Sequence, residues 1–377
     1  MAERCRAAGF GATVFTGAAW HPLARSRGID IAALPGLDAV DGDDDADAGE
    51  KLSRRAARMA VGLAPVIAER GVDLVVSDVI TVAGLWAAEL AGVPAVELSP
   101  HPLYRPSRGL PPVGAGLAPG RGLAGRLRDM AMRTASDRSV RIGERQRVAA
   151  RATIGLSGPT PEPAARLIAT LPALEVPRPD WPADAHLVGP LLWEPTADRF
   201  DRPPGDGPLV VIAPSTAVTG AADMLTVTLR AMCHVAASRR VRVVISTLSA
   251  ITDETLAEGG SVAMVAGSAR QDEVLRDADL VICGGGHGML AKSLLAGVPV
   301  VTVPGGGDQW ELANRVVRQG SGLLVRPVDE ASLATAIAAV LDDPSYRAAA
   351  RTAADSVAGV VDPVGVVRWC LESPSAG

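Results

Sequence analysis

The chain has 377 residues with 48% hydrophobic and 21% charged side chains, a composition that favours buried cores in two domains over one. Its net charge of −5 and its 3% aromatic content argue against a nucleic-acid partner, which would need a basic face or stacking platforms. The four cysteines lie far apart without metal-ligand spacing, so we expect no metal site, no disulfide and a cytoplasmic location. The longest apolar stretch, residues 79–98, is interrupted by charged residues and a proline and predicts no membrane span, although contact with a membrane surface stays open.

The first hundred residues alternate short apolar runs with stretches of helical periodicity. We predict strands at residues 12–16, 73–77 and 95–98, and helices at 54–70 and 81–90. Several of the apolar runs are bounded by glycine, proline or aspartate, which is typical of buried strands in a βα sequence.

The next hundred residues are less regular. Residues 100–125 are rich in proline, glycine and arginine and predict an irregular lobe beside the sheet. Two long amphipathic helical stretches follow within 122–155. Many prolines leave residues 159–185 without a clear period, and residues 187–192 close the first domain.

The C-terminal half alternates strands and helices more regularly. Residues 195–207, rich in proline and charge, form the predicted linker between domains at 1–194 and 208–377. We predict six strands beyond it, at 209–213, 241–246, 262–265, 280–283, 298–303 and 323–325. This alternation predicts an α/β fold whose parallel sheets are covered by helices and bind ligands beyond the carboxyl ends of their strands.

Two strand-to-helix turns in this half are built of glycine. One reads Gly284-Gly285-Gly286-His287-Gly288, and the other runs from Pro304 through three glycines to Asp308-Gln309. Each places the unpaired N–H groups and the positive dipole end of a helix at the sheet edge, so two together predict a site for an anion such as a nucleoside diphosphate. The first turn is not a dinucleotide fingerprint, because Met289 stands where that motif needs its third glycine. A tight turn without a ligand is the alternative.

These turns resemble the donor-binding signature of GT-B glycosyltransferases, the family of macrolide, antibiotic and lipid glycosyltransferases that use nucleotide sugars. The family pattern runs His-x-Gly-x-x-(Ser/Thr), an apolar helix, Gly-Val-Pro, a strand and Asp-Gln. Weaker similarity in the N-terminal half covers residues 74–78, 90–94 and 188–191. The resemblance implies a GT-B fold, in which two Rossmann-like domains with parallel sheets face each other across a cleft. We also expect the last helix to pack back on the N-terminal domain.

The resemblance assigns most of the donor site to the C-terminal domain. Glycine-turn N–H groups would hold the diphosphate, Asp308-Gln309 the sugar hydroxyls, and Gln271 the nucleotide base. The predicted donor-binding residues are Ser215, Thr216, Gln271, Gly285, Gly286, His287, Gly288, Met289, Asp308 and Gln309. No cofactor is implied, because the nucleotide sugar is a substrate. Three local alternatives stay open: Asp308-x-x-Glu311 is also a capping box, Ser215 and Thr216 are ordinary capping residues, and Lys292 either contacts phosphate or is solvated.

Three positions depart from the family pattern. Gly284 replaces the phosphate-contacting histidine, Met289 replaces the Ser/Thr, and Ser268 replaces a base-stacking tryptophan. His287 stands where relatives carry Trp or His, and either compensates for the lost histidine or only fills the turn. The choice between a uracil and a thymine nucleotide is therefore open.

The acceptor side carries an incomplete catalytic pair. Asp78 matches a family aspartate that orients a general-base histidine, although capping of the following helix explains it equally well. The family places that histidine in a Gly-His-x-x-Pro loop after the first strand, and we expect this strand and loop upstream of Met1. His21 and His101 are the nearby candidates, and both are expected to be structural.

The leading interpretation is an inverting, metal-independent hexosyltransferase that moves a sugar from a UDP- or dTDP-sugar to a small hydrophobic acceptor. The lobe at residues 79–135, rich in Pro, Leu and Met, is the expected acceptor site, and a lipid, polyketide or antibiotic-like aglycone is expected on family analogy. The alternatives are a non-catalytic sugar-nucleotide or lipid-binding relative, or a truncated inactive enzyme. A GT-B sugar-nucleotide epimerase is less well supported, because only Asp308 and Glu311 offer carboxylates at the donor site.

Overall fold

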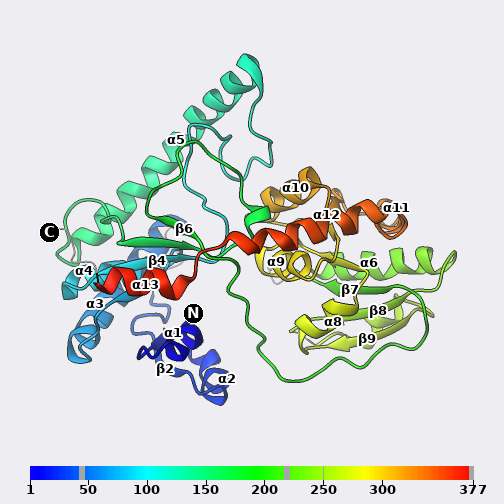
Figure 1. Ribbon diagram of the computed structural model, residues 1–377, viewed down its shortest axis with the longest axis horizontal. Helices are drawn as coiled ribbons and strands as arrows, with labels where there is room; N and C mark the ends of the chain where they lie inside the picture. Colours follow the sequence, from blue (N-terminus) through cyan, green and yellow to red (C-terminus); the bar gives the residue numbers. More distant parts are fainter. Residues whose placement is uncertain (42–46, 216–220, 249, 373–377) are drawn as a thin grey trace.

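The computed structural model describes residues 1–41, 47–215, 221–248 and 250–372. The described strands form three parallel sheets, one in the C-terminal half of the chain and two in the N-terminal half (Figure 1). The predicted α/β class with parallel sheets is confirmed.

The C-terminal half contains a six-stranded sheet with the order β12-β11-β10-β7-β8-β9. All neighbouring strands in it are parallel. The strands are β7 (Leu209–Ala213), β8 (Arg242–Ser246), β9 (Ala263–Gly267), β10 (Leu280–Cys283), β11 (Val300–Thr302) and β12 (Gly322–Leu324).

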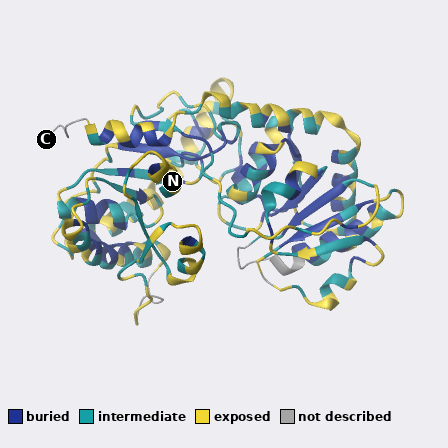
Figure 2. Ribbon diagram, turned by 60° about the horizontal axis from the view of Figure 1, so that its bottom comes forward, coloured by how far each residue is buried: buried dark blue, intermediate teal, exposed yellow. Residues whose placement is uncertain are grey.

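Both faces of the central strands β7, β10 and β11 are buried, which explains their continuous apolar sequences (Figure 2). In β7, Val210 and Ile212 pack in the core under α6 and α11, whereas Leu209 and Val211 pack in the core under α8, α9, α10 and α12. The helices are α6 (Ala221–Ala236), α7 (Asp253–Ala257), α8 (Gln271–Asp277), α9 (His287–Leu295), α10 (Gln309–Gln319), α11 (Glu330–Asp342) and α12 (Pro344–Asp355), followed by the 3-10 turn η4 (Ser356–Gly359).

The N-terminal half contains two separate sheets. A four-stranded parallel sheet has the order β3-β4-β5-β6, and β1 pairs only with β2 among the described strands. The strands are β1 (Thr13–Thr16), β2 (Asp30–Ala33), β3 (Val75–Asp78), β4 (Ala95–Ser99), β5 (Ala165–Ile168) and β6 (Ala185–Leu187). β2 and β5 were not predicted, because each is a four-residue strand inside a stretch that reads as irregular.

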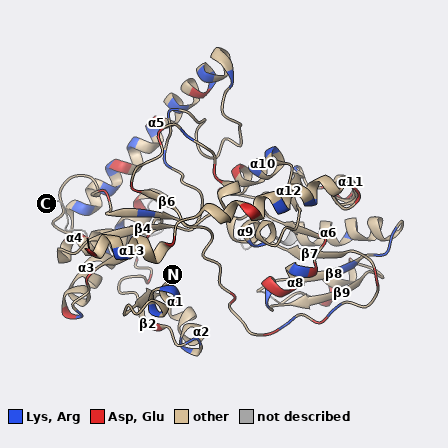
Figure 3. Ribbon diagram, in the orientation of Figure 1, with Lys and Arg blue, Asp and Glu red and all other residues tan. Residues whose placement is uncertain are grey.

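Trp86 of α4 is fully buried at the centre of the N-terminal helical core, between α3 and α4. The helices here are α1 (Ala2–Ala7), α2 (His21–Ser26), α3 (Ala48–Glu69), α4 (Ala83–Ala91) and α5 (Gly122–Ala152), with the 3-10 turns η1 (Ala18–Trp20) and η3 (Pro172–Leu174). The prediction of two helical stretches within 122–155 was wrong: α5 is one helix of 31 residues, because Gly125 and Gly143 each cost only about 1 kcal/mol of helix stability and do not end it. Many arginines line α5 (Figure 3).

The last helix, α13 (Pro363–Glu372), returns to the N-terminal half. Its Val366 and Cys370 pack with Val96 of β4, Leu167 of β5 and Val188 in one buried cluster. Figure 1 shows α13 beside β4, on the opposite side of the molecule from the C-terminal sheet. Within the described part of the chain, no helix is both long and apolar enough to span a bilayer.

Candidate functional site

Three loops meet at the carboxyl edge of the six-stranded sheet, where the strand order reverses. The chain extends the sheet from β7 towards β9 in one direction and from β10 towards β12 in the other. Cys283 pairs in register with Ala213 on one side and Thr302 on the other, so the loops after β7, β10 and β11 start side by side. Ligands of parallel α/β sheets bind at such a reversal.

The loop after β10 offers unpaired backbone donors. Gly285 has a φ of +83°, a left-handed conformation that glycine adopts without strain, and it turns the chain into α9. The first hydrogen bond of α9 runs from Leu290 N to Gly286 O at 3.1 Å, so the N–H groups of residues 287–289 have no partner within the helix. The helix dipole adds positive potential, which suits the turn to an anion.

Gly284 has no room for a side chain, because two neighbouring residues occupy the space beside it. A Cβ on Gly284 would lie 2.7 Å from Ser215 Cβ and 3.3 Å from Gln309 Oε1. Gln309 Nε2 donates to Ser215 Oγ at 2.8 Å, and Gly305 N donates to Gln309 Oε1 at 2.9 Å. The space of the family's histidine is thus filled by a bridge that ties the loop after β7 to the loop after β11 and packs against Gly284. Thr216, the predicted neighbour of Ser215, lies outside the described residues.

Asp308 stands at the start of α10 but does not cap it. Its φ is −82° and its ψ −4°, and its side chain makes no capping hydrogen bond. The carboxylate instead accepts from the Tyr104 hydroxyl at 2.9 Å on Oδ2. Glu311 accepts from Gly116 N at 2.7 Å and Arg315 Nε at 3.0 Å rather than reaching back to the helix start. The capping-box alternative is wrong, and the Asp308 carboxylate lies at the loop after β11 without capping α10.

His287 links the donor turn to the N-terminal half. Its Nε2 lies 2.8 Å from Oγ1 of Thr170, a fully buried residue just after β5. Burial, with a smaller effect of the nearby His101, lowers the pKa of His287 to about 4. The imidazole is therefore neutral at pH 7 and offers a diphosphate no positive charge. Its backbone N–H remains a donor at the helix start.

Gln271 and Lys292 belong to a hydrogen-bonded group that holds the start of the predicted linker. Lys292 Nζ lies 2.7 Å from Glu194 Oε1 and donates to Gln271 Oε1 at 2.9 Å. Gln271 Nε2 donates to Ser246 Oγ at 2.9 Å. The Lys292 and Glu194 side chains are 13% and 12% exposed, so Lys292 is not a solvated lysine. Its charge is paired before any phosphate arrives.

Asp78 ends β3 at the carboxyl edge of the N-terminal sheet. Its Oδ1 accepts from Ile80 N at 2.8 Å and from Thr81 N at 3.2 Å, so the carboxylate shapes the turn before α4. This turn ends at Val82, whose φ of +43° is the one left-handed non-glycine backbone among the described residues. A bulky residue held there is strained, which is more common at functional sites than elsewhere.

The two candidate histidines of the N-terminal half have different surroundings. His21 opens α2, and its Nε2 lies 3.2 Å from Thr16 O. His101 follows β4 and stacks on Tyr104, with ring centroids 4.5 Å apart and an interplanar angle of 18°. Because Tyr104 contacts Asp308, His101 lies beside the donor loops and His21 has no such link.

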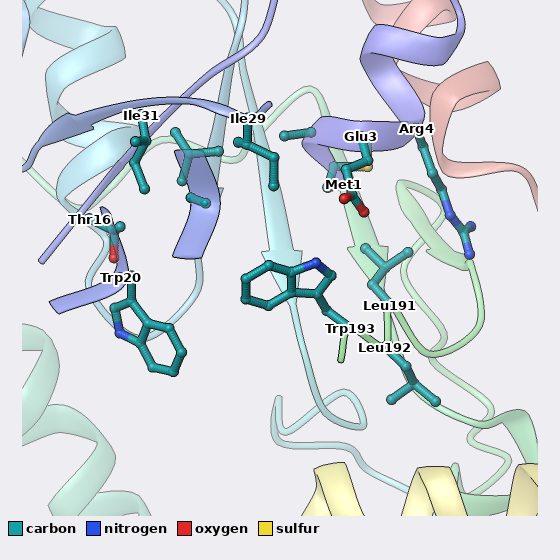
Figure 4. Close-up of a pocket in the computed structure, with 13 residues that line it drawn as sticks. Met1, Glu3, Arg4, Thr16, Trp20, Ile29, Ile31, Leu191, Leu192 and Trp193 are labelled. Carbon is teal, nitrogen blue, oxygen red and sulfur yellow. The ribbon is translucent and has the colours of Figure 1, made fainter. Parts of the chain in front are cut away.

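An apolar pocket of about 450 Å³ lies apart from these loops (Figure 4). Its lining residues come from 1–31 and 191–193, with Trp193 between Trp20 and Leu191 in the view. Among the described residues, no group of three or more His, Cys, Asp or Glu side chains is arranged to hold a metal ion.

Tyr104 and Thr170 contact the predicted donor residues but were not predicted from the sequence. Each meets its partner across a large sequence distance, 204 residues for Tyr104 and Asp308 and 117 for Thr170 and His287. The only local signal was that Tyr104 is one of two tyrosines in the chain and lies in the irregular lobe.

The sequence is similar to glycosyltransferases of natural-product and glycolipid synthesis. Residues 244–373 match the C-terminal domain of erythromycin biosynthesis protein CIII-like proteins. The chain is 28% identical over 316 residues to 4'-demethylrebeccamycin synthase of Lentzea aerocolonigenes, covering 78% of this chain and 73% of the relative. It is 30% identical over 195 residues to a PGL/p-HBAD biosynthesis rhamnosyltransferase of Mycobacterium bovis, covering 50% of this chain and 41% of that relative. These similarities support the predicted likeness to the macrolide glycosyltransferase-like family.

Solved structures share the fold of this glycosyltransferase. The glycosyltransferase of kitacinnamycin superposes with a TM-score of 0.70 at 17% identity, over 97% of this chain and 91% of that one. A spinosyn rhamnosyltransferase complexed with spinosyn aglycone gives 0.65 at 19% identity, over 97% and 93%. A Streptomyces glycosyltransferase complexed with thymidine diphosphate gives 0.62 at 19% identity, over 98% and 94%. The predicted GT-B fold and enzyme class are confirmed.

Proposed function

We propose that this glycosyltransferase moves a sugar from a UDP- or dTDP-sugar to a hydroxyl of a small hydrophobic acceptor, with inversion and without a metal. The observation that carries the proposal is the meeting of three loops at the reversal of strand order, with free helix N–H groups on one loop and the Asp308 carboxylate on another. Anionic and hydroxyl-bearing parts of one ligand are both matched there.

The related solved structures support both halves of this proposal. One was solved with thymidine diphosphate and another with spinosyn aglycone. On the acceptor side, the N-terminal half offers an irregular lobe and the apolar residues Leu123, Leu127 and Met130, which are exposed on α5. A lipid, polyketide or antibiotic-like aglycone would suit this surface.

The proposed reaction is a single displacement. The acceptor oxygen forms a bond to the anomeric carbon while the bond from that carbon to the diphosphate oxygen breaks on the opposite face, which inverts the configuration. Negative charge develops on the leaving diphosphate over the N-terminus of α9, where the N–H groups of residues 287–289 are already oriented. Oriented donors of this kind stabilise a leaving group without needing a metal ion.

His101 is the group we propose to take the acceptor's proton. Its Nδ1 lies 2.8 Å from the Pro102 carbonyl oxygen and 3.0 Å from Ser99 Oγ. Because a carbonyl oxygen only accepts, the hydrogen is on Nδ1 and the lone pair is on Nε2. No described residue bonds Nε2, which leaves a basic nitrogen beside the donor loops.

Binding is tested first, by thermal shift with UDP-glucose, dTDP-glucose, UDP and dTDP at millimolar concentration. A ligand that binds only the folded chain raises the melting temperature. A donor site at the glycine turn predicts a shift with at least one nucleotide, and its loss when Gly286 is replaced by a bulky residue such as Trp. Absence of any shift would exclude the proposed donor site.

Product formation with a mixed aglycone library then separates an enzyme from a sugar-nucleotide-binding relative. His101→Gln is expected to lower kcat by about 100-fold, because general bases contribute on the order of 10²–10⁴ in rate, and to leave nucleotide binding unchanged. His21→Gln is the matched control and should retain activity. Equal activities of the two variants would exclude His101 as the base.

A further inference from the structure

We infer that Tyr104 is a positioning residue that holds the Asp308 carboxylate towards the sugar of the donor. The phenol belongs to the N-terminal half, and its hydroxyl donates to Asp308 Oδ2 at 2.9 Å across the space between the halves. The inference rests on the proposed function, because it concerns the same sugar-binding carboxylate. It adds a residue from the acceptor side to the donor site.

The Tyr104 ring is held in place by two neighbours. His101 stacks on it at 4.5 Å, and the Arg315 guanidinium lies 5.9 Å from its centroid. Arg315 is itself fixed, because it is buried, donates to Leu174 O at 2.7 Å and pairs with Glu311 at 3.0 Å. The direction of the phenol hydroxyl is therefore set before any ligand binds.

The Tyr104 hydroxyl favours one of two conformations that are open to the Asp308 carboxylate. The sequence Asp308-x-x-Glu311 would allow the carboxylate to turn inward and cap the free N–H groups of α10. In the structure the cap is not made, and the Tyr104 hydroxyl holds Oδ2 instead. Oδ1 has no hydrogen-bond partner among the described residues and stays available to sugar hydroxyls. Without the phenol oxygen, the capping conformation competes for the carboxylate.

The segment around Tyr104 does not depend on this one hydrogen bond. Gly116 N donates to Glu311 Oε2 at 2.7 Å, and Arg318 donates to Gly116 O at 2.9 Å. Trp310 Nε1 also donates to Ala115 O at 3.3 Å. The irregular lobe is thus fastened to α10 at other points. Tyr104→Phe keeps the ring and its stacking and removes only the hydroxyl.

The test compares Tyr104→Phe with Tyr346→Phe, the other tyrosine of the chain, which packs at the edge of the C-terminal core. Affinities are measured for UDP-glucose against UDP and for dTDP-glucose against dTDP. Tyr104→Phe is expected to weaken binding of the sugar nucleotide by about tenfold, the size of one hydrogen bond to a charged group, and to leave the nucleoside diphosphate unchanged. Tyr346→Phe should change neither. Equal loss for both ligands would show a general structural effect and overturn the inference.

A double-mutant cycle shows whether Tyr104 acts through Asp308. Asp308→Asn should weaken the sugar nucleotide selectively, and adding Tyr104→Phe should then cost no more than about twofold further. Independent losses that multiply would overturn the inference. If Asp308→Asn itself leaves the sugar nucleotide unaffected, the proposed donor site is wrong and the inference falls with it. If Asp308→Asn is selective and Tyr104→Phe is silent, only the role of Tyr104 is refuted.

Discussion

Acidification should destabilise the folded chain through His287. Folding holds this imidazole against Thr170 in a buried position, and its pKa falls from 6.5 to about 4. The unfolded chain takes up a proton near pH 6.5, whereas the folded chain stays neutral until about pH 4. The contribution of the neutral imidazole to the free energy of unfolding is therefore fully present above pH 6.5 and is lost as the pH falls towards 4. Below pH 4 both the folded and the unfolded chain are protonated, so the loss does not increase further.

The size of this loss follows from the pKa difference. One unit corresponds to 1.36 kcal/mol, so a shift of this size is worth about 3 kcal/mol, of which about 2–3 kcal/mol is lost between pH 7.5 and pH 4.5. This is a large share of the stability of an ordinary domain.

Urea unfolding at pH 7.5 and pH 4.5 measures the effect in the wild type and in His287→Gln. Glutamine cannot titrate, so the difference in unfolding free energy between the two proteins should change by about 2–3 kcal/mol, in the direction that disfavours the wild type at low pH. His234→Gln is the matched control, because His234 is a solvent-exposed histidine with 63% of its side chain accessible. Parallel pH dependence in wild type and His287→Gln would refute a buried, neutral imidazole at this position.

Three further predictions concern the same region. Gly284→Ala should destabilise the chain by about 1–3 kcal/mol through overpacking against Ser215, and Ser215→Gly in the same chain should restore part of the loss in thermal unfolding. Burial and the neighbouring Asp308 raise the pKa of the Tyr104 hydroxyl. In a Tyr346→Phe background, absorbance at 295 nm should therefore show Tyr104 still protonated well above pH 10. Ionisation of Tyr104 near pH 10 would contradict the buried geometry. Burial raises the pKa of Cys283 to about 11, so this thiol should react with a disulfide reagent at pH 8 only after unfolding, and rapid labelling of the folded chain would contradict that.

The sequence predicted the C-terminal fold well because its strands are buried on both faces. The strands predicted at residues 209–213 and 280–283 coincide with β7 and β10. Short, continuous apolar runs bounded by glycine, proline or aspartate are typical of strands that are buried on both faces. In the N-terminal half, β5 was missed. Its residues, Ala165–Ile168, lie between prolines and include Arg166, whose buried guanidinium pairs with Glu97 and Asp184 from distant parts of the sequence as well as with Glu162 nearby.

The candidate site was predictable in its location and not in its contacts. Glycine turns after adjacent strands place a ligand at one sheet edge, whatever the remaining sequence. The contacts of each side chain depend on partners that are distant in the sequence. The local motif at Asp308 is compatible with a helix cap as well as with a ligand contact. The choice between them depends on Tyr104, which no local pattern connects to α10. Likewise, Lys292 is neither solvated nor free for phosphate, because it pairs with Glu194, the residue just before the predicted linker.

The return of α13 to the N-terminal half orders events during protein synthesis. The cluster that holds Val96 and Leu167 is completed by Val366 and Cys370, which leave the ribosome after the whole C-terminal sheet. The N-terminal sheet therefore lacks the apolar cover that α13 provides while the C-terminal half is being translated. The nascent chain would expose apolar strands to chaperones or to aggregation during this interval, and the two halves would finish folding together once α13 is released.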